Sequence, residues 1–181
     1  MAQTIVDFEA RRDTAGHIRI YELPANDGGG SWEYAGLNDR YHPAILKHLK
    51  GLVLSGLHQE AEALAVAYIA NYTDVVTRWG VTDPSVEMYL RDCCFNRGPG
   101  GAAKILQIAL GFYGRDVDGQ IGAKTRAALE AYKNVPTTLL RAFRKARETY
   151  EDIVAPGRPN LRKGLVNRWN GALMAAEAMA A

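Results

Sequence analysis

The stretch that most constrains the fold runs from residue 91 to residue 129, because it reads as helical segments separated by glycine-rich breaks. After the break at residues 98–101, apolar residues recur at helical spacing and form one stripe: Ala102, Ile105, Leu106, Ala109 and Leu110. Residues 116–122 are then of the types that favour turns, including glycines that accept positive φ. A helix restarts near Thr125, so the stretch predicts a helix-turn-helix with a defined loop.

The rest of the chain predicts a mainly α fold with one small β-hairpin near the N-terminus. Alternating residues at 17–23 and 31–35 predict the two strands, around a turn at residues 24–30. In the first half of the chain, helices are expected at residues 2–10, 43–56 and 58–79. Further helices are expected to begin at the Asp83-Pro84 cap, at Val135-Pro136 and at about residue 161, the last of them running to the end. We expect one compact unit, 1–181, with an N-terminal lobe at 1–82 and a helical lobe at 83–181.

Composition excludes several classes of function. The chain carries 22 basic and 20 acidic residues, and this net charge of +2 is far below that of a typical nucleic-acid-binding domain. The four histidines lack the spacing of metal ligands, so we expect no metal and no cofactor. Cys93 and Cys94 are adjacent, which turns their side chains about 100° apart on a helix and predicts two small buried or half-buried residues without a disulfide.

The N-terminal residues lack the basic start and long apolar run of a signal peptide. No apolar segment approaches the roughly 20 residues of a membrane span. We therefore expect the protein to be made in the cytoplasm. A site of action outside the cytoplasm would require a holin, a secretion system or lysis.

Several motifs resemble the muramidases of glycoside hydrolase family 108, which are phage-type endolysins of the lysozyme superfamily. The main motif is the Leu-Gln-x-Ala-Leu and Asp-Gly-x-x-Gly-x-x-Thr pattern of residues 106–125. Before it, Asp92, Asn96 and Gly98 match a family helix with the pattern Asp…Asn-x-Gly. Near the end of the chain, Gly-Leu-x-Asn-Arg-Trp at residues 164–169 is similar to the family's closing pattern. The family's Glu-Gly-Gly is matched only at Glu9, and its proline after the second turn glycine is replaced by Ala123. The resemblance implies a lysozyme-like fold with a peptidoglycan-binding-like C-terminal half.

Glu9 is the first candidate for a catalytic acid. It ends a short helix whose apolar residues include Ile5, Val6 and Phe8. The negative end of the helix dipole and apolar neighbours both favour the protonated carboxyl group that a general acid requires. Pairing with Arg12 on a solvated surface is the alternative interpretation. Glu22, which precedes the glycine cluster, is the alternative acid.

Asp27 is the candidate for the second catalytic carboxylate. It opens the Asp-Gly-Gly-Gly loop, where the family has Asp-Pro-Gly-Gly. An inverting glycosidase needs its acid and base about 6.5–9.5 Å apart, so that a water molecule fits between the base and the sugar. Asp before Gly is also a common turn former, so a purely structural role stays open. Glu33 on the return strand is a weaker choice.

Other residues are candidates for substrate binding. Tyr72, with Asp74 and Trp79, offers aromatic and acidic side chains for a saccharide groove, although aromatic residues at helical spacing also suit a core. Asp92 and Asn96 share a helix face and either bind substrate or hold the helices together. The basic residues Arg141, Arg144, Lys145 and Arg147 are expected to form a solvated helix surface.

The resemblance implies a peptidoglycan hydrolase that cleaves the β-1,4 bond between N-acetylmuramic acid and N-acetylglucosamine. Glu9 would act as the acid, with Asp27 or another carboxylate assisting the attacking water. Glu22, Glu33, Tyr72, Asp92 and Asn96 would contact the substrate. The alternatives are a non-catalytic peptidoglycan-binding protein and a phage or secretion accessory protein.

Overall fold

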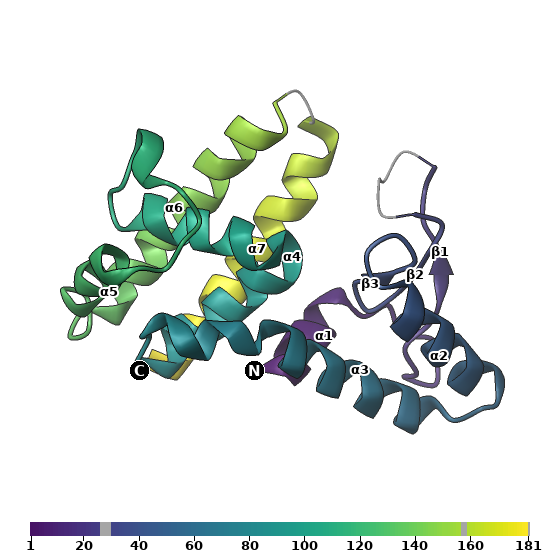
Figure 1. Cartoon of the computed structure of the whole chain (residues 1–181). Coiled ribbons are helices and arrows are strands. Elements are labelled where there is room, and N and C mark those ends of the chain that lie inside the picture. Colours follow the sequence, from purple (N-terminus) through teal and green to yellow (C-terminus); the bar gives the residue numbers. More distant parts are fainter. Residues whose placement is uncertain (26–29, 157–158, 181) are drawn as a thin grey trace. The chain divides into compact units, whose positions relative to one another are not determined.

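The computed structural model describes residues 1–25, 30–156 and 159–180 (Figure 1). The described chain is mostly helical, with a small antiparallel sheet near the N-terminus, which confirms the predicted fold class. It divides into two compact units, Met1–Tyr72 and Thr73–Ala181. The boundary follows Tyr72, earlier in the chain than the lobe boundary expected after Thr82.

The first unit begins with α1 (Ala2–Glu9), whose Ile5 and Val6 are fully buried. Its sheet has the order β1 (Tyr21–Glu22), β2 (Trp32–Tyr34) and β3 (Leu37–Asn38). The expected strand at 17–23 is shorter than predicted, and Ile18 forms only an isolated bridge with Arg12.

The third strand, β3, was not predicted. It follows a tight turn in which Ala35 and Gly36 both have positive φ, at 48° and 79°. Two such residues in succession form the turn that best matches the twist of paired antiparallel strands. The chain therefore returns along β2, where Tyr34 lies opposite Leu37, and both side chains are buried.

Two helices complete the first unit, and both place apolar residues in its core. α2 (Pro43–Leu54) contributes Leu46 and Leu49, and α3 (His58–Thr73) contributes Ala61, Ala65 and Ile69. The helix predicted to continue through Trp79 changes at Asp74 into the 3-10 helix η1 (Asp74–Trp79), which belongs to the second unit. Gly80 ends it in the left-handed conformation.

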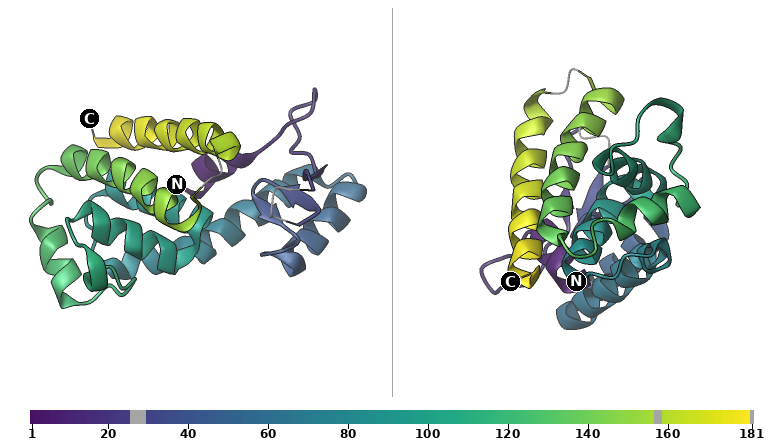
Figure 2. Two further views of the ribbon diagram at one scale, coloured as in Figure 1. Left: turned by 90° about the horizontal axis from the view of Figure 1, so that it is seen from above. Right: turned by 90° about the vertical axis from the view of Figure 1, so that its left-hand side faces the viewer.

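The second unit is built around α4 (Pro84–Ala109), against which α6 (Pro136–Val154) and α7 (Pro159–Ala180) pack side by side (Figure 2). The expected cap at Asp83 is confirmed, because its carboxylate accepts hydrogen bonds from the backbone N–H groups of Ser85 and Val86 at 2.9 and 3.1 Å. Along the sequence, η2 (Gly114–Asp116) and α5 (Ala123–Glu130) connect α4 to α6. The helix restart after the 116–122 turn is thus confirmed.

The predicted glycine-rich break is a kink within α4. Gly98 has φ 67° and ψ 167°, a conformation that is not helical, while helix continues on both sides. That region of backbone space is accessible essentially only to glycine. Gly98 therefore divides α4 into two arms, and Pro99 begins the second arm.

Replacing Gly98 with alanine is expected to lower the free energy of unfolding by about 1–3 kcal/mol, because alanine is strained in this conformation. Urea denaturation followed by far-UV circular dichroism measures the change. Gly100→Ala is the matched control, since Gly100 has nothing within 4 Å of its would-be Cβ and its φ is not positive. An equal loss of stability in both variants would contradict the role assigned to Gly98.

Both cysteines are buried and free in α4, which confirms the prediction made from their adjacency. Burial raises the pKa of the Cys93 thiol to about 11 and that of the Cys94 thiol to about 12. Among the described residues, no helix is both long and apolar enough to span a bilayer.

Candidate active site

Glu9, the candidate acid, is the last residue of α1 and is half-buried. The preceding turns of the helix are fixed by Ile5 and Val6, which lie in the core of the first unit. The charge of Glu9 acts on Tyr21 of β1 and helps to raise the pKa of its phenol. The negative charge of Glu9 therefore reaches Tyr21 and disfavours loss of the phenol proton.

Tyr21 also joins Glu33 to this cluster. Residues 21 and 33 lie opposite each other in the β1–β2 register, and the Tyr21 hydroxyl donates a hydrogen bond to the Glu33 carboxylate. Burial is the main cause of the raised pKa of Tyr21, followed by Glu33, whereas Arg11 acts in the opposite direction. The Arg11 guanidinium lies over the Tyr21 ring, 3.9 Å from its centre. Tyr21 thus keeps its proton at neutral pH and acts as a donor.

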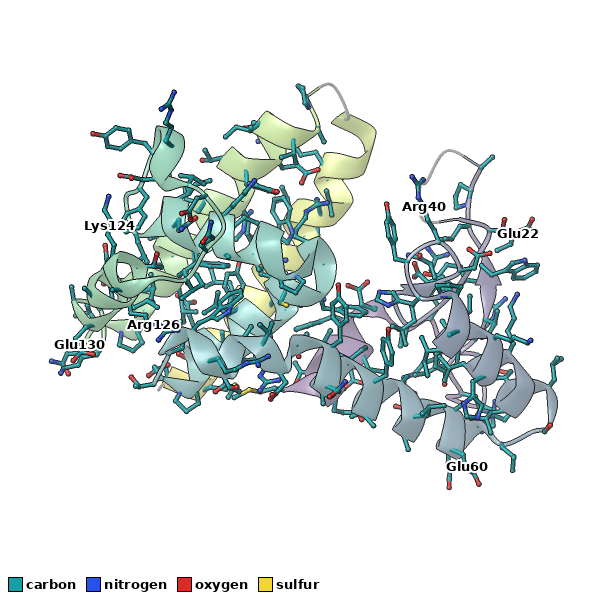
Figure 3. All side chains as sticks on the ribbon, viewed as in Figure 1. Glu22, Arg40, Glu60, Lys124, Arg126 and Glu130 are labelled. Atoms are coloured by element: carbon teal, nitrogen blue, oxygen red, sulfur yellow. The ribbon has the colours of Figure 1, made fainter. Side chains whose placement is uncertain are left out.

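Glu22, the alternative acid, lies on the other face of the sheet. Its partner in the register is Trp32, and successive strand residues point to opposite faces. Its side chain is exposed and points away from the ribbon (Figure 3). Of the two candidate acids, Glu9 is the one that shares a cluster with a second carboxylate.

Asp27 lies outside the described residues, but the strand that follows its loop is anchored by Asp39. The Asp39 carboxylate accepts hydrogen bonds from the backbone N–H groups of Ser31 and Trp32, at 2.8 and 3.3 Å, and these bonds lower its pKa. The backbone of Gly30 lies so close to the Asp39 side chain that a Cβ on residue 30 would be 2.0 Å from Asp39 Oδ1. Tyr21, Arg11 and Asp39 were not predicted as site residues from the sequence. The register of β1 with β2 would have identified Tyr21.

Arg12, the expected surface partner of Glu9, is bound by other acids. Its guanidinium donates to Asp7 at 3.0 Å and to both oxygens of Glu62 at 2.8 and 3.0 Å. Glu62 is the main cause of the raised pKa of Arg12. The contact ties the segment after α1 to α3, which helps to hold the end of α1 in place.

Tyr72 belongs to an aromatic cluster in the first unit. Its half-buried ring packs edge-on against His42, with ring centres 5.3 Å apart, and stacks beside Tyr68 at 6.3 Å. Burial lowers the pKa of His42, so this imidazole is neutral at pH 7, and its Nδ1 lies 3.0 Å from the Tyr68 hydroxyl. Asp74 and Trp79, which were expected to line a saccharide groove with Tyr72, lie in the second unit. Trp79 is buried there, and Asp74 pairs with Arg91 at 3.4 Å.

Asp92 and Asn96 hold helices together within the second unit. Asp92 is fully buried and binds Arg147 of α6 at 2.7 Å and Arg168 of α7 at 2.5 Å. Asn96 accepts a second hydrogen bond from Arg147 at 2.7 Å. The expectation that Arg147 lies on a solvated helix surface was wrong, because its side chain is buried in this network. Of the two interpretations of Asp92, the structure favours the one in which it ties helices together.

No group of three or more potential metal ligands occurs among residues 1–25, 30–156 and 159–180. The candidate active site consists of Glu9, Tyr21, Glu33 and Arg11. It holds two carboxylates, a protonated phenol and a cation, which are groups suited to proton transfer and to binding polar substrates.

Comparison with known proteins gives a family match and likenesses to solved structures. Residues 101–170 match the family described as a predicted peptidoglycan domain. No curated protein sequence matches the chain. The structure titled "Structure of Brucella abortus SagA" is similar to 97% of this chain and 90% of its own length, with a TM-score of 0.65 and 21% sequence identity. The structural likeness shows a shared fold, and the family match associates the second unit with peptidoglycan.

Proposed function

We propose that the protein is a peptidoglycan hydrolase of the N-acetylmuramidase type. The observation that carries this proposal is the hydrogen bond from the half-buried Tyr21 to the Glu33 carboxylate, with the charge of Glu9 acting on the same tyrosine. Glycosidases use two carboxyl groups that flank the scissile bond. The match of residues 101–170 to a peptidoglycan family supports the choice of polymer.

In the proposed reaction, Glu9 donates its proton to the oxygen that leaves the muramic acid carbon. The glycosidic bond breaks, and water adds to that carbon to give a new reducing end. A second carboxylate either accepts the proton of the attacking water or first forms a bond to the sugar. Glu33 is favoured for this role by its link through Tyr21, and Asp27 is the other candidate. Action on the wall would follow export by a holin, a secretion system or lysis.

Digestion of purified sacculi tests the proposal. The products are reduced with borohydride and analysed by mass spectrometry, which identifies the sugar at each new end. Soluble fragments that end in reduced N-acetylmuramic acid are expected. Fragments that end in reduced N-acetylglucosamine, or no soluble fragments, would contradict the assignment of the bond.

Replacing Tyr21 with phenylalanine is expected to lower kcat by about 10- to 100-fold with little change in KM. The substitution removes a hydrogen bond to a charged group, which is worth about 1.5–3 kcal/mol. Tyr21 acts here as a positioning residue for Glu33. Steady-state kinetics on soluble glycan fragments separates kcat from KM. Tyr41→Phe is a control, since Tyr41 is 64% exposed. A rise in KM alone would contradict a positioning role.

The second candidate is a non-catalytic peptidoglycan-binding protein. It is favoured by the position of the family match, which lies wholly within the second unit and does not include Glu9. In that case, purified sacculi would bind the protein in a pull-down and release no reducing ends. A protein that fails to bind sacculi would instead support an accessory role.

A further inference from the structure

The second unit contains a surface pocket of about 310 Å³, at the lower end of the range for small-molecule sites. Its lining comes from η1, the kink of α4, the turn before α5 and α5 itself. We call it the arginine pocket, and its lining residues are Val75, Arg78, Trp79, Pro99, Gly100, Ala103, Gly119, Ile121 and Arg126.

The rim of the arginine pocket is held in place by Gln107 of α4. The buried Gln107 side chain donates to the Asp118 carboxylate at 2.7 Å and to the Gln120 carbonyl at 3.0 Å, and it accepts from the Gly119 N–H at 2.8 Å. The turn lies so close to the kink that a Cβ on Gly119 would approach the Gly100 carbonyl oxygen to 3.3 Å. The pocket is therefore bounded by a fixed turn.

Two arginines give the pocket its charge. Arg126, which is labelled in Figure 3, donates from Nη2 to the backbone carbonyl of Arg78 at 3.1 Å, and this bond fixes the Arg126 side chain across η1. Within the described part of the chain, neither guanidinium has a carboxylate within 4 Å, whereas in the same unit Arg91 has two and Arg97 has one. The pocket thus presents two cations that have no anionic partner among these residues.

The remaining lining is largely apolar, with Val75, Trp79, Ala103 and Ile121. A guanidinium binds carboxylates through paired hydrogen bonds, and an apolar wall beside it favours a ligand with small hydrocarbon groups. A free inorganic anion would match the charge and leave the apolar wall unused.

We propose that the arginine pocket binds the terminal carboxylate of a short peptide with small apolar side chains. This inference rests on the proposed function for its choice of peptide, which is the alanine-ended stem peptide of peptidoglycan. The pocket then adds a peptide-binding site to a protein whose candidate active site acts on glycan.

Calorimetric titration of the full chain tests the pocket directly. The probes are N-acetyl-D-alanyl-D-alanine, its C-terminal amide and inorganic phosphate. The free acid is expected to bind at least about tenfold more tightly than the amide, because loss of one charge-assisted contact costs about 1.4 kcal/mol or more. Equal binding of acid and amide, or phosphate binding as tight as that of the acid, would overturn the proposal.

Matched variants locate the binding. Arg78→Gln and Arg126→Gln are each expected to weaken binding of the acid at least about tenfold. Arg115→Gln is the control, because this exposed residue belongs to the same unit and lies outside the pocket lining. Circular dichroism establishes that each variant is folded. Unchanged affinity in both folded pocket variants would overturn the proposal.

A second assay separates this proposal from the proposed hydrolase activity. Sacculi and glycan strands freed of peptides by an amidase are digested in parallel. The pocket variants are expected to match the unmodified protein on peptide-free strands and to be slower on peptide-bearing strands. Acid binding without release of reducing ends from either substrate would contradict the hydrolase and leave the pocket standing. Release of reducing ends without acid binding would support the hydrolase and overturn the peptide-binding proposal.

Discussion

Glu9→Gln is expected to slow the release of reducing ends from peptidoglycan by about 100- to 10,000-fold, which is the usual contribution of a positioned general acid. Glutamine keeps the shape of the side chain and removes the proton that the leaving oxygen needs. Glu9 ends α1, and the helix is held by Ile5 and Val6, so the fold is expected to stay intact. Reducing-end release from purified sacculi measures the rate, and a sacculus pull-down measures binding.

Glu22→Gln is the matched control, because Glu22 is an exposed glutamate one residue from the cluster and on the opposite face of β1. Its activity should remain close to that of the unmodified protein. If Glu9→Gln digests sacculi at the normal rate, Glu9 is not the acid. If Glu22→Gln is the inactive variant, the assignment of the two glutamates is reversed.

Asp92→Asn is expected to lower the free energy of unfolding of the second unit by about 3–5 kcal/mol, because it leaves the fully buried Arg147 without its anionic partner. Asp92 also binds Arg168, so the substitution weakens contacts to two helices at once. Urea denaturation followed by tryptophan fluorescence measures the loss, since the buried Trp169 lies on α7 in the same unit.

Asp152→Asn is the control, because Asp152 and its partner Arg162 are both exposed. Its unfolding midpoint should be unchanged. A double-mutant cycle with Arg147→Met isolates the buried pair. The loss caused by Asp92→Asn should be smaller in the Arg147→Met background. Strictly additive losses would contradict a direct interaction between these two residues.

Local rules predicted most of the helical architecture. The Asp83 cap, the helix beginning at Pro136 and the break at Gly98 each depend on one or two residues with strong conformational preferences. The structure confirms all three because tertiary contacts and local preference agree there. The position of Glu9 at the end of α1 follows from the same kind of rule.

The partners of the charged residues could not be predicted in this way. Arg147 sits in a run of basic residues that reads as a solvated surface, and its burial depends on Asp92, 55 positions away in the sequence. Tyr21 acquires its role from the strand register that places it opposite Glu33, and the alternating sequence predicted a strand here without specifying which residues lie opposite each other. Contacts over long sequence separations are set by the packing of whole elements, which periodicity alone does not specify.

The two buried thiols of α4 bear on how the protein responds to oxidising and reducing conditions. Cys93 and Cys94 are the only cysteines of the chain, both are enclosed, and both remain in the unreactive thiol form at neutral pH. The folded protein is thus not expected to form disulfides through these thiols. When the folded protein is moved from a reducing medium into an air-saturated one, we expect no disulfide cross-link to form and no oxidoreductase to be needed.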